Sequence, residues 1–130
     1  MNVKSILRSI GAVVAGFATW TVLWLSSNAA ARAIVPDAFD DQGLTSSTGI
    51  LLFLLVASVV YSIVAGWVTA AVAGRAEVPH TVALGVVQTA IGIAVQLAYW
   101  DVMPLWYHLP FLALLLPGNV LGGWLRASRS

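Results

Sequence analysis

Long apolar stretches constrain the fold of this chain more than any other feature of its sequence. The run from Ser9 to Ala31 contains no charged side chain, and three further apolar runs follow it. A helix needs about 20 mostly apolar residues to cross the hydrocarbon core of a bilayer. Since each run reaches that length, the sequence predicts four membrane-spanning helices. They are expected over about 5–33, 49–73, 78–100 and 105–125.

The composition agrees with a chain whose main solvent is lipid. Of the 130 residues, 60% are hydrophobic and 8% are charged, whereas soluble domains carry roughly 25% charged residues. The connections are too short to fold as separate units. The predicted fold class is therefore an all-α membrane protein, with a single four-helix transmembrane domain over 1–130. The absence of cysteine excludes disulfides and thiolate metal sites, and a net charge of +1 gives no general attraction to nucleic acid.

The N-terminus has a competing interpretation as a secretory signal peptide, because Lys4 and Arg8 precede an apolar run that ends near the small pair Ala31 and Ala33. The apolar core of a signal peptide is about 7–15 residues long. This run is longer, and so we expect a retained first helix.

Basic residues predict the orientation in the membrane. With four spans, the N-terminal tail, the second connection and the C-terminal tail lie on one side, and they carry most of the positive charge. The positive-inside rule makes this side cytoplasmic, which predicts a multi-pass membrane protein with both termini in the cytoplasm. The basic residues concerned are Lys4, Arg8, Arg75, Arg126 and Arg129.

The opposite side is expected to carry Arg32 and an acidic loop that includes Asp37, Asp40 and Asp41. The spacing of these aspartates lacks the alternating ligands of a calcium-binding loop, so no metal site is predicted. Aromatic residues mark the membrane interfaces. Tyr99, Trp100, Trp106 and Tyr107 are expected at the outer interface, and Trp124 at the inner one.

Small residues recur at helical spacing in all four segments. In lipid, such residues let helix backbones approach closely, which replaces the missing hydrophobic drive. The short turn between Gly74 and His80 makes the second and third helices an antiparallel hairpin, with small residues expected between them. Gly74 is predicted to cap the second helix. The predicted helix-packing residues are Gly11, Ala15, Gly16, Ser58, Ser62, Gly66, Ala70, Gly85, Gly92, Gly118 and Gly122.

The third helix carries a polar stripe that includes Gln88 and Gln96, with Thr89 beside it, and Asn119 lies in the fourth helix. A side-chain amide needs partners in hydrocarbon. Two interpretations stay open: these side chains bond neighbouring helices, or Gln88, Thr89 and Gln96 line a polar path shared between protomers.

The two histidines limit cofactor chemistry. His80 is expected at the inner side and His108 at the outer side, separated by most of a bilayer about 30 Å thick. They cannot jointly ligate one haem within a protomer. No cofactor is predicted, although either histidine alone remains a candidate axial ligand for haem or chlorophyll. Asp101 and His108 lie on the same side, but Pro104 separates them and no nucleophile accompanies them, so no enzyme is expected.

Transport families offer a further comparison. The chain resembles the small multidrug-resistance exporters in size and helix count, but it lacks the carboxylate that they carry in the first helix. It also resembles the dual-topology fluoride channels in length, and Gly118-Asn119 is similar to part of their asparagine motif. The one-sided distribution of basic residues disagrees with dual topology.

The segment Ala65–Arg75, followed by His80 and Gly85, resembles a segment of small, uncharacterised bacterial four-helix membrane proteins. This resemblance implies an inner-membrane protein with no assigned chemistry, and it carries over no functional residues. We expect a non-enzymatic accessory or assembly subunit that contacts other membrane proteins or a second copy. The alternatives are a small oligomeric channel or transporter and a haem- or pigment-binding subunit.

Overall fold

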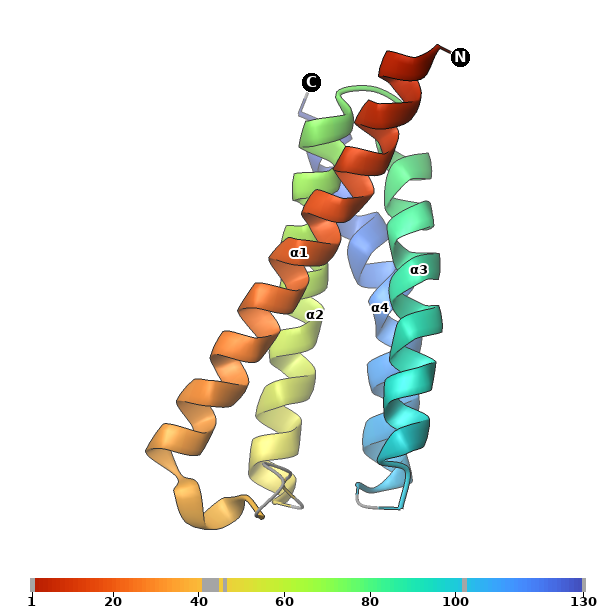
Figure 1. The fold of residues 1–130 in the computed structure, drawn as a ribbon. Coiled ribbons are helices and arrows are strands. Elements are labelled where there is room, and N and C mark those ends of the chain that lie inside the picture. Colours follow the sequence, from red (N-terminus) through yellow and green to blue (C-terminus); the bar gives the residue numbers. More distant parts are fainter. Residues whose placement is uncertain (1, 41–44, 46, 102, 130) are drawn as a thin grey trace.

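The computed structural model describes residues 2–40, 45, 47–101 and 103–129, which form a bundle of long helices (Figure 1). In this part of the chain the elements are α1 (Val3–Ile34), the short 3₁₀ helix η1 (Pro36–Ala38), α2 (Thr48–Ala73), α3 (Glu77–Ala98) and α4 (Leu105–Ala127). Each bound lies within two residues of the expected one. The prediction for Asp41 falls outside the described residues.

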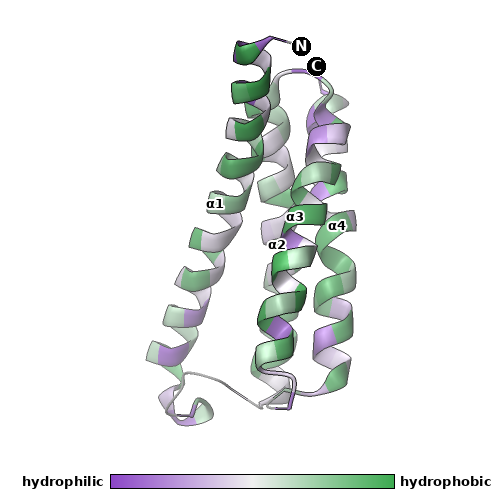
Figure 2. Ribbon diagram, turned by 45° about the vertical axis from the view of Figure 1, so that its right-hand side comes forward, coloured by the Kyte–Doolittle hydropathy of each residue, from purple (hydrophilic) through white to green (hydrophobic). Residues whose placement is uncertain are grey.

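Four of the described helices are long and apolar enough to cross a membrane. This confirms an all-helical fold with four candidate membrane-spanning helices. Both termini and the α2–α3 connection lie at one end of the bundle, and the other two connections lie at the opposite end (Figure 1). All four long helices carry exposed large hydrophobic side chains, as expected for side chains solvated by lipid. Hydrophobic residues are spread along the ribbons of these helices (Figure 2).

Local sequence explains where the helices begin and end. The side chain of Asn2 accepts a hydrogen bond from the Ser5 backbone at 2.8 Å and caps α1. Gly74 ends α2 with φ of 71°, a left-handed conformation that glycine adopts without steric cost, which confirms its predicted role as a C-cap. Pro104 precedes the first turn of α4, where its missing N–H leaves no bond unmade.

The small-residue face of α2 packs against α4, and the expectation that it packs against α3 is wrong. A Cβ on Gly66 would overlap the backbone of Asn119, and one on Gly122 would overlap the backbone of Ile63. A Cβ on Gly118 would lie 2.7 Å from that of Ser62. Both helices present small residues here, so their backbones approach closely. Contact between α2 and α3 is much less extensive, because a short turn makes helices antiparallel without deciding which neighbour each packs against.

Large side chains fill the other end of the bundle. Leu51 and Leu54 of α2 pack with Tyr107, Phe111 and Leu115 of α4 in one buried cluster. Tyr107 is only 2% exposed and stacks on Phe111 with ring centroids 5.6 Å apart. Its predicted place in an interfacial aromatic belt is therefore wrong, since the ring points into the bundle.

Candidate functional site

A pair of buried amides joins α3 to α4. Asn119 donates a hydrogen bond from Nδ2 to Oε1 of Gln88 over 2.6 Å. Gln88 is 4% exposed and Asn119 is fully buried. Gln88 thus bonds a neighbouring helix, which is the first of the two interpretations left open by the sequence.

This pair satisfies only half of its hydrogen-bonding capacity. Within the described residues, Nε2 of Gln88 and Oδ1 of Asn119 are buried without a partner. Rotating both amides does not remove the deficit, because one donor and one acceptor remain unpaired in either arrangement. A buried polar group without a partner costs about 1–3 kcal/mol. The pair is therefore a weak point in the packing of the bundle, and Oγ1 of Thr89 is a third atom of this kind.

A second polar cluster lies about two turns further along α3. Gln96 contacts Nδ1 of His108 through its amide, and Nε2 of His108 lies 3.1 Å from the backbone oxygen of Trp100. The imidazole is fully buried and stacks on the Trp100 ring at 4.4 Å between centroids. These contacts lock the histidine between the end of α3 and the start of α4.

Both nitrogens of the His108 ring are engaged. A carbonyl oxygen only accepts, so Nε2 donates to Trp100. Nδ1 faces Oε1 of Gln96, and a half-turn of the amide would exchange its oxygen and its nitrogen at this contact. In either arrangement the ring engages one end of the Gln96 amide, and the other end lies on the opposite side.

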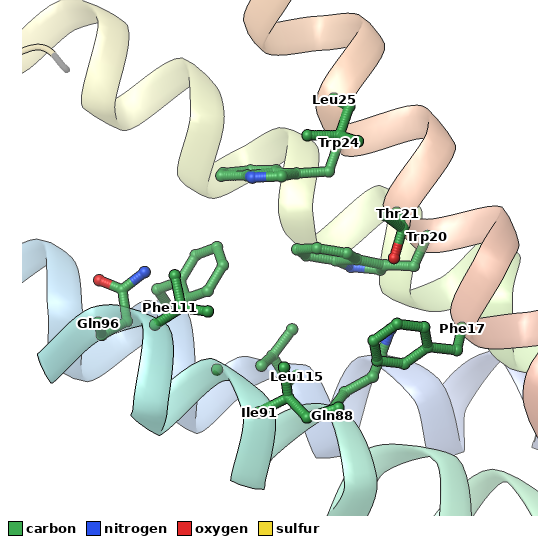
Figure 3. Close-up of a pocket in the computed structure, with 12 residues that line it drawn as sticks. Phe17, Trp20, Thr21, Trp24, Leu25, Gln88, Ile91, Gln96, Phe111 and Leu115 are labelled. Atoms are coloured by element: carbon green, nitrogen blue, oxygen red, sulfur yellow. The ribbon is translucent and has the colours of Figure 1, made fainter. Parts of the chain in front are cut away.

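That opposite side is a cavity. It has a volume of about 310 Å³ and is bounded by the middle of α1, by α3 and by α4. Gln88 and Gln96 both lie on its wall, while the rest of the lining is mainly apolar and aromatic (Figure 3). Gln96 also borders an adjoining cavity of about 140 Å³.

Aromatic rings form the wall that faces α3. Trp20 and Trp24 of α1 stack with centroids 5.2 Å apart, and Phe111 of α4 packs against both. Trp20 also donates from Nε1 to Oγ of Ser62 over 3.1 Å. This bond anchors the indole to α2 and holds the ring at the edge of the cavity.

The predicted polar residues of α3 do not all lie at one site. The structure brings Gln88 and Gln96 to the same cavity, whereas Thr89 is not among the residues that line it. Both ring nitrogens of His108 are engaged, and His80 bonds Ala76 and Ser9, each at 2.8 Å. Either histidine would have to break a hydrogen bond to ligate an iron atom.

Sequence reasoning placed His108 at the interface and missed its contact with Gln96. One signal was present in the sequence. In an antiparallel helical hairpin, residues equally far from the connection lie opposite each other. Gln96 and His108 are placed in this way about the α3–α4 connection, as are, approximately, Gln88 and Asn119.

Small residues on α1 occupy two adjacent faces. Ala12 and Gly16 point inward, and a Cβ on Gly16 would overlap the side chain of Thr69. Gly11 and Ala18 are exposed, with Ala15 half-buried between them, and nothing lies within 4 Å of a Cβ built on Gly11. The outward face therefore contributes little to packing within the chain.

The other predicted glycines lie inside the bundle. A Cβ on Gly85 would overlap Leu116, and one on Gly92 would lie 3.1 Å from Leu112. Both leucines belong to α4, so α3 uses its glycines to approach α4. Ala70 is 1% exposed, and Ser58 is equally buried.

The described residues contain no group of three His, Cys, Asp or Glu side chains placed to hold a metal ion. No protein-family model, curated protein or solved structure matches the chain.

Proposed function

We propose that this chain is a non-enzymatic integral membrane protein that serves as an accessory or assembly subunit through helix contacts. The observation that supports this proposal is the uncovered small face of α1, formed by Gly11, Ala15 and Ala18. Small residues exposed to lipid offer a second helix a close approach that bulky side chains prevent. The partner is another membrane protein or a second copy of this chain.

The packing of α1 adds support. Only 11% of the residues in its most apolar window are buried, against 39% for α2 and α4. α1 contacts α2 along one side only, from Ala12, whose backbone oxygen accepts from Oγ1 of Thr69 over 2.8 Å, to Ser27, which contacts the hydroxyl of Tyr61. Much of this helix is thus available to a partner.

Native mass spectrometry from lipid tests the proposal. We expect a dimer or a complex with a co-purifying membrane protein, and we expect Gly11→Leu to reduce it by about tenfold, because the leucine would hold the partner helix away. Ala83→Leu places the same side chain on the exposed face of α3 and serves as the control. A monomer under all lipid conditions, or equal effects of the two variants, would contradict the proposal.

We also propose that the protein resides in a bacterial inner membrane, with the end that carries both termini in the cytoplasm. The basic residues that support this orientation make contacts there. Nε of Arg8 donates to the backbone oxygen of Val72 over 2.9 Å, and the guanidinium groups of Arg126 and Arg129 lie 6.0 and 5.7 Å from the centre of the Trp67 ring.

Passage of a small solute is a second candidate function, favoured by the position of Gln88 and Gln96 on the wall of one cavity. Solute flux into proteoliposomes tests it. Flux should fall in both Gln88→Leu and Gln96→Leu, and unchanged flux in both variants would exclude this path.

A further inference from the structure

The cavity between α1 and α3 has the properties of a preformed ligand site. Its volume of about 310 Å³ falls at the lower end of the range of small-molecule pockets, roughly 300–1,000 Å³. A dry apolar cavity of about 150 Å³ is enough for benzene. This one therefore suits a compact molecule of about two fused rings, or one ring with a short chain.

The walls are held in place independently of any ligand. On one side, the bond from Trp20 to Ser62 and the stacking of Trp24 fix two indoles. On the other side, Gly92 lies in the wall of the cavity, and its lack of a side chain lets α3 pack closely against Leu112 and Leu115 of α4. Figure 3 shows the rings of α1 facing α3 across this space.

One polar side chain distinguishes the cavity from a gap that lipid tails would fill. Gln96 is 94% buried, since its exposed fraction is 6%, and one end of its amide is bonded to His108. The other end has no hydrogen bond among the described residues and is not one of the fully enclosed atoms. Gln96 belongs to the wall of both adjoining cavities. Whichever end of the amide is free can form a hydrogen bond with a hydroxyl group, because the NH₂ group donates and the carbonyl oxygen accepts.

We propose that the cavity binds an uncharged, lipid-soluble molecule with a compact ring body and one hydroxyl group. The ring packs against Trp20, Trp24 and Phe111, and the hydroxyl forms a hydrogen bond with the free end of the Gln96 amide. An acyl chain fills the same volume without satisfying that end of the amide, so the hydroxyl provides the selectivity. This inference does not depend on the partner proposed for α1.

Photolabelling in lipid nanodiscs tests the inference with a matched pair of probes. One probe is a benzyl alcohol that carries a photoreactive diazirine, and the other is the corresponding toluene without the hydroxyl. We expect the alcohol to label the residues that bound the cavity, including Trp24 and Val95, at a concentration roughly fivefold lower than the toluene, as one hydrogen bond allows. An excess of unlabelled 2-naphthol should prevent this labelling.

Two variants and one control show where the probes bind. Gly92→Leu adds a large side chain to the wall of the cavity and should abolish labelling by both probes. The control, Ala90→Leu, adds the same side chain on the exposed surface of α3 and should leave labelling unchanged. Gln96→Met keeps the shape of the side chain, and it should remove the preference for the alcohol while leaving labelling by the toluene intact.

Equal labelling of the wild-type protein by the two probes would overturn the proposal, because the cavity would then hold apolar molecules without selecting the hydroxyl. Adducts spread over the lipid-facing surfaces of all helices would overturn it as well. If Gln96→Met does not fold, the comparison of the two probes on the wild-type protein and on Gly92→Leu still decides the question.

Discussion

At the scale of single residues, the Gln88–Asn119 pair shows how a buried polar contact can stabilise and weaken a membrane protein at once. We predict that Gln88→Met lowers the free energy of unfolding by about 1–3 kcal/mol. The side chain of Asn119 then loses the one hydrogen bond that it makes within the described part of the chain. The double variant Gln88→Met/Asn119→Leu removes both unpaired atoms and should be more stable than Gln88→Met. Unfolding by SDS, followed by tryptophan fluorescence, measures this cycle.

The cycle separates two explanations for the pair. If the hydrogen bond outweighs the unpaired atoms, the double variant is less stable than the wild-type protein, because a net favourable pair has been removed. That result would contradict our view that the unpaired donor and acceptor make the pair a weak point of the bundle. Gln96→Met provides a comparison with Gln88→Met, because both variants replace a buried glutamine by a methionine of similar shape. Gln96 contacts His108, whose other ring nitrogen also has a partner.

At the scale of helices, the α2–α4 interface is expected to be the least tolerant of added volume. Gly66→Ala should lower the free energy of unfolding by about 1–3 kcal/mol, because the new methyl group overlaps the backbone of Asn119 and two helices must separate. Gly11→Ala on the uncovered face of α1 should change it by less than about 0.5 kcal/mol. The same SDS titration checks both variants, and equal losses would contradict the packing described above.

The helices could be predicted from sequence to within a few residues, since the apolar runs set their lengths and Gly74 marks an end. The pairing of the helices could not be predicted. The short turn after Gly74 makes α2 and α3 antiparallel, but it does not determine which helix packs over Ser62 and Gly66. The polar stripe of α3 predicted two residues of the cavity wall, Gln88 and Gln96. Trp20 and Phe111 could not be predicted in this way, because the cavity depends on how three helices diverge in space and no periodic pattern within one helix encodes that divergence.

At the scale of the whole molecule, the orientation that we propose rests on the distribution of charge, and its test uses the absence of cysteine from the chain. Ser128→Cys and Asp37→Cys place single thiols at opposite ends of the bundle. We expect a membrane-impermeant maleimide to label the Asp37→Cys thiol in intact bacterial cells, and the Ser128→Cys thiol only after permeabilisation. The basic residues near the termini and at Arg75 resist translocation, whereas the opposite end carries Asp37, Asp40 and Asp101 against a single basic residue, Arg32. Labelling of both thiols in intact cells would instead indicate two orientations, and then the outward face of α1 would meet antiparallel as well as parallel copies of itself.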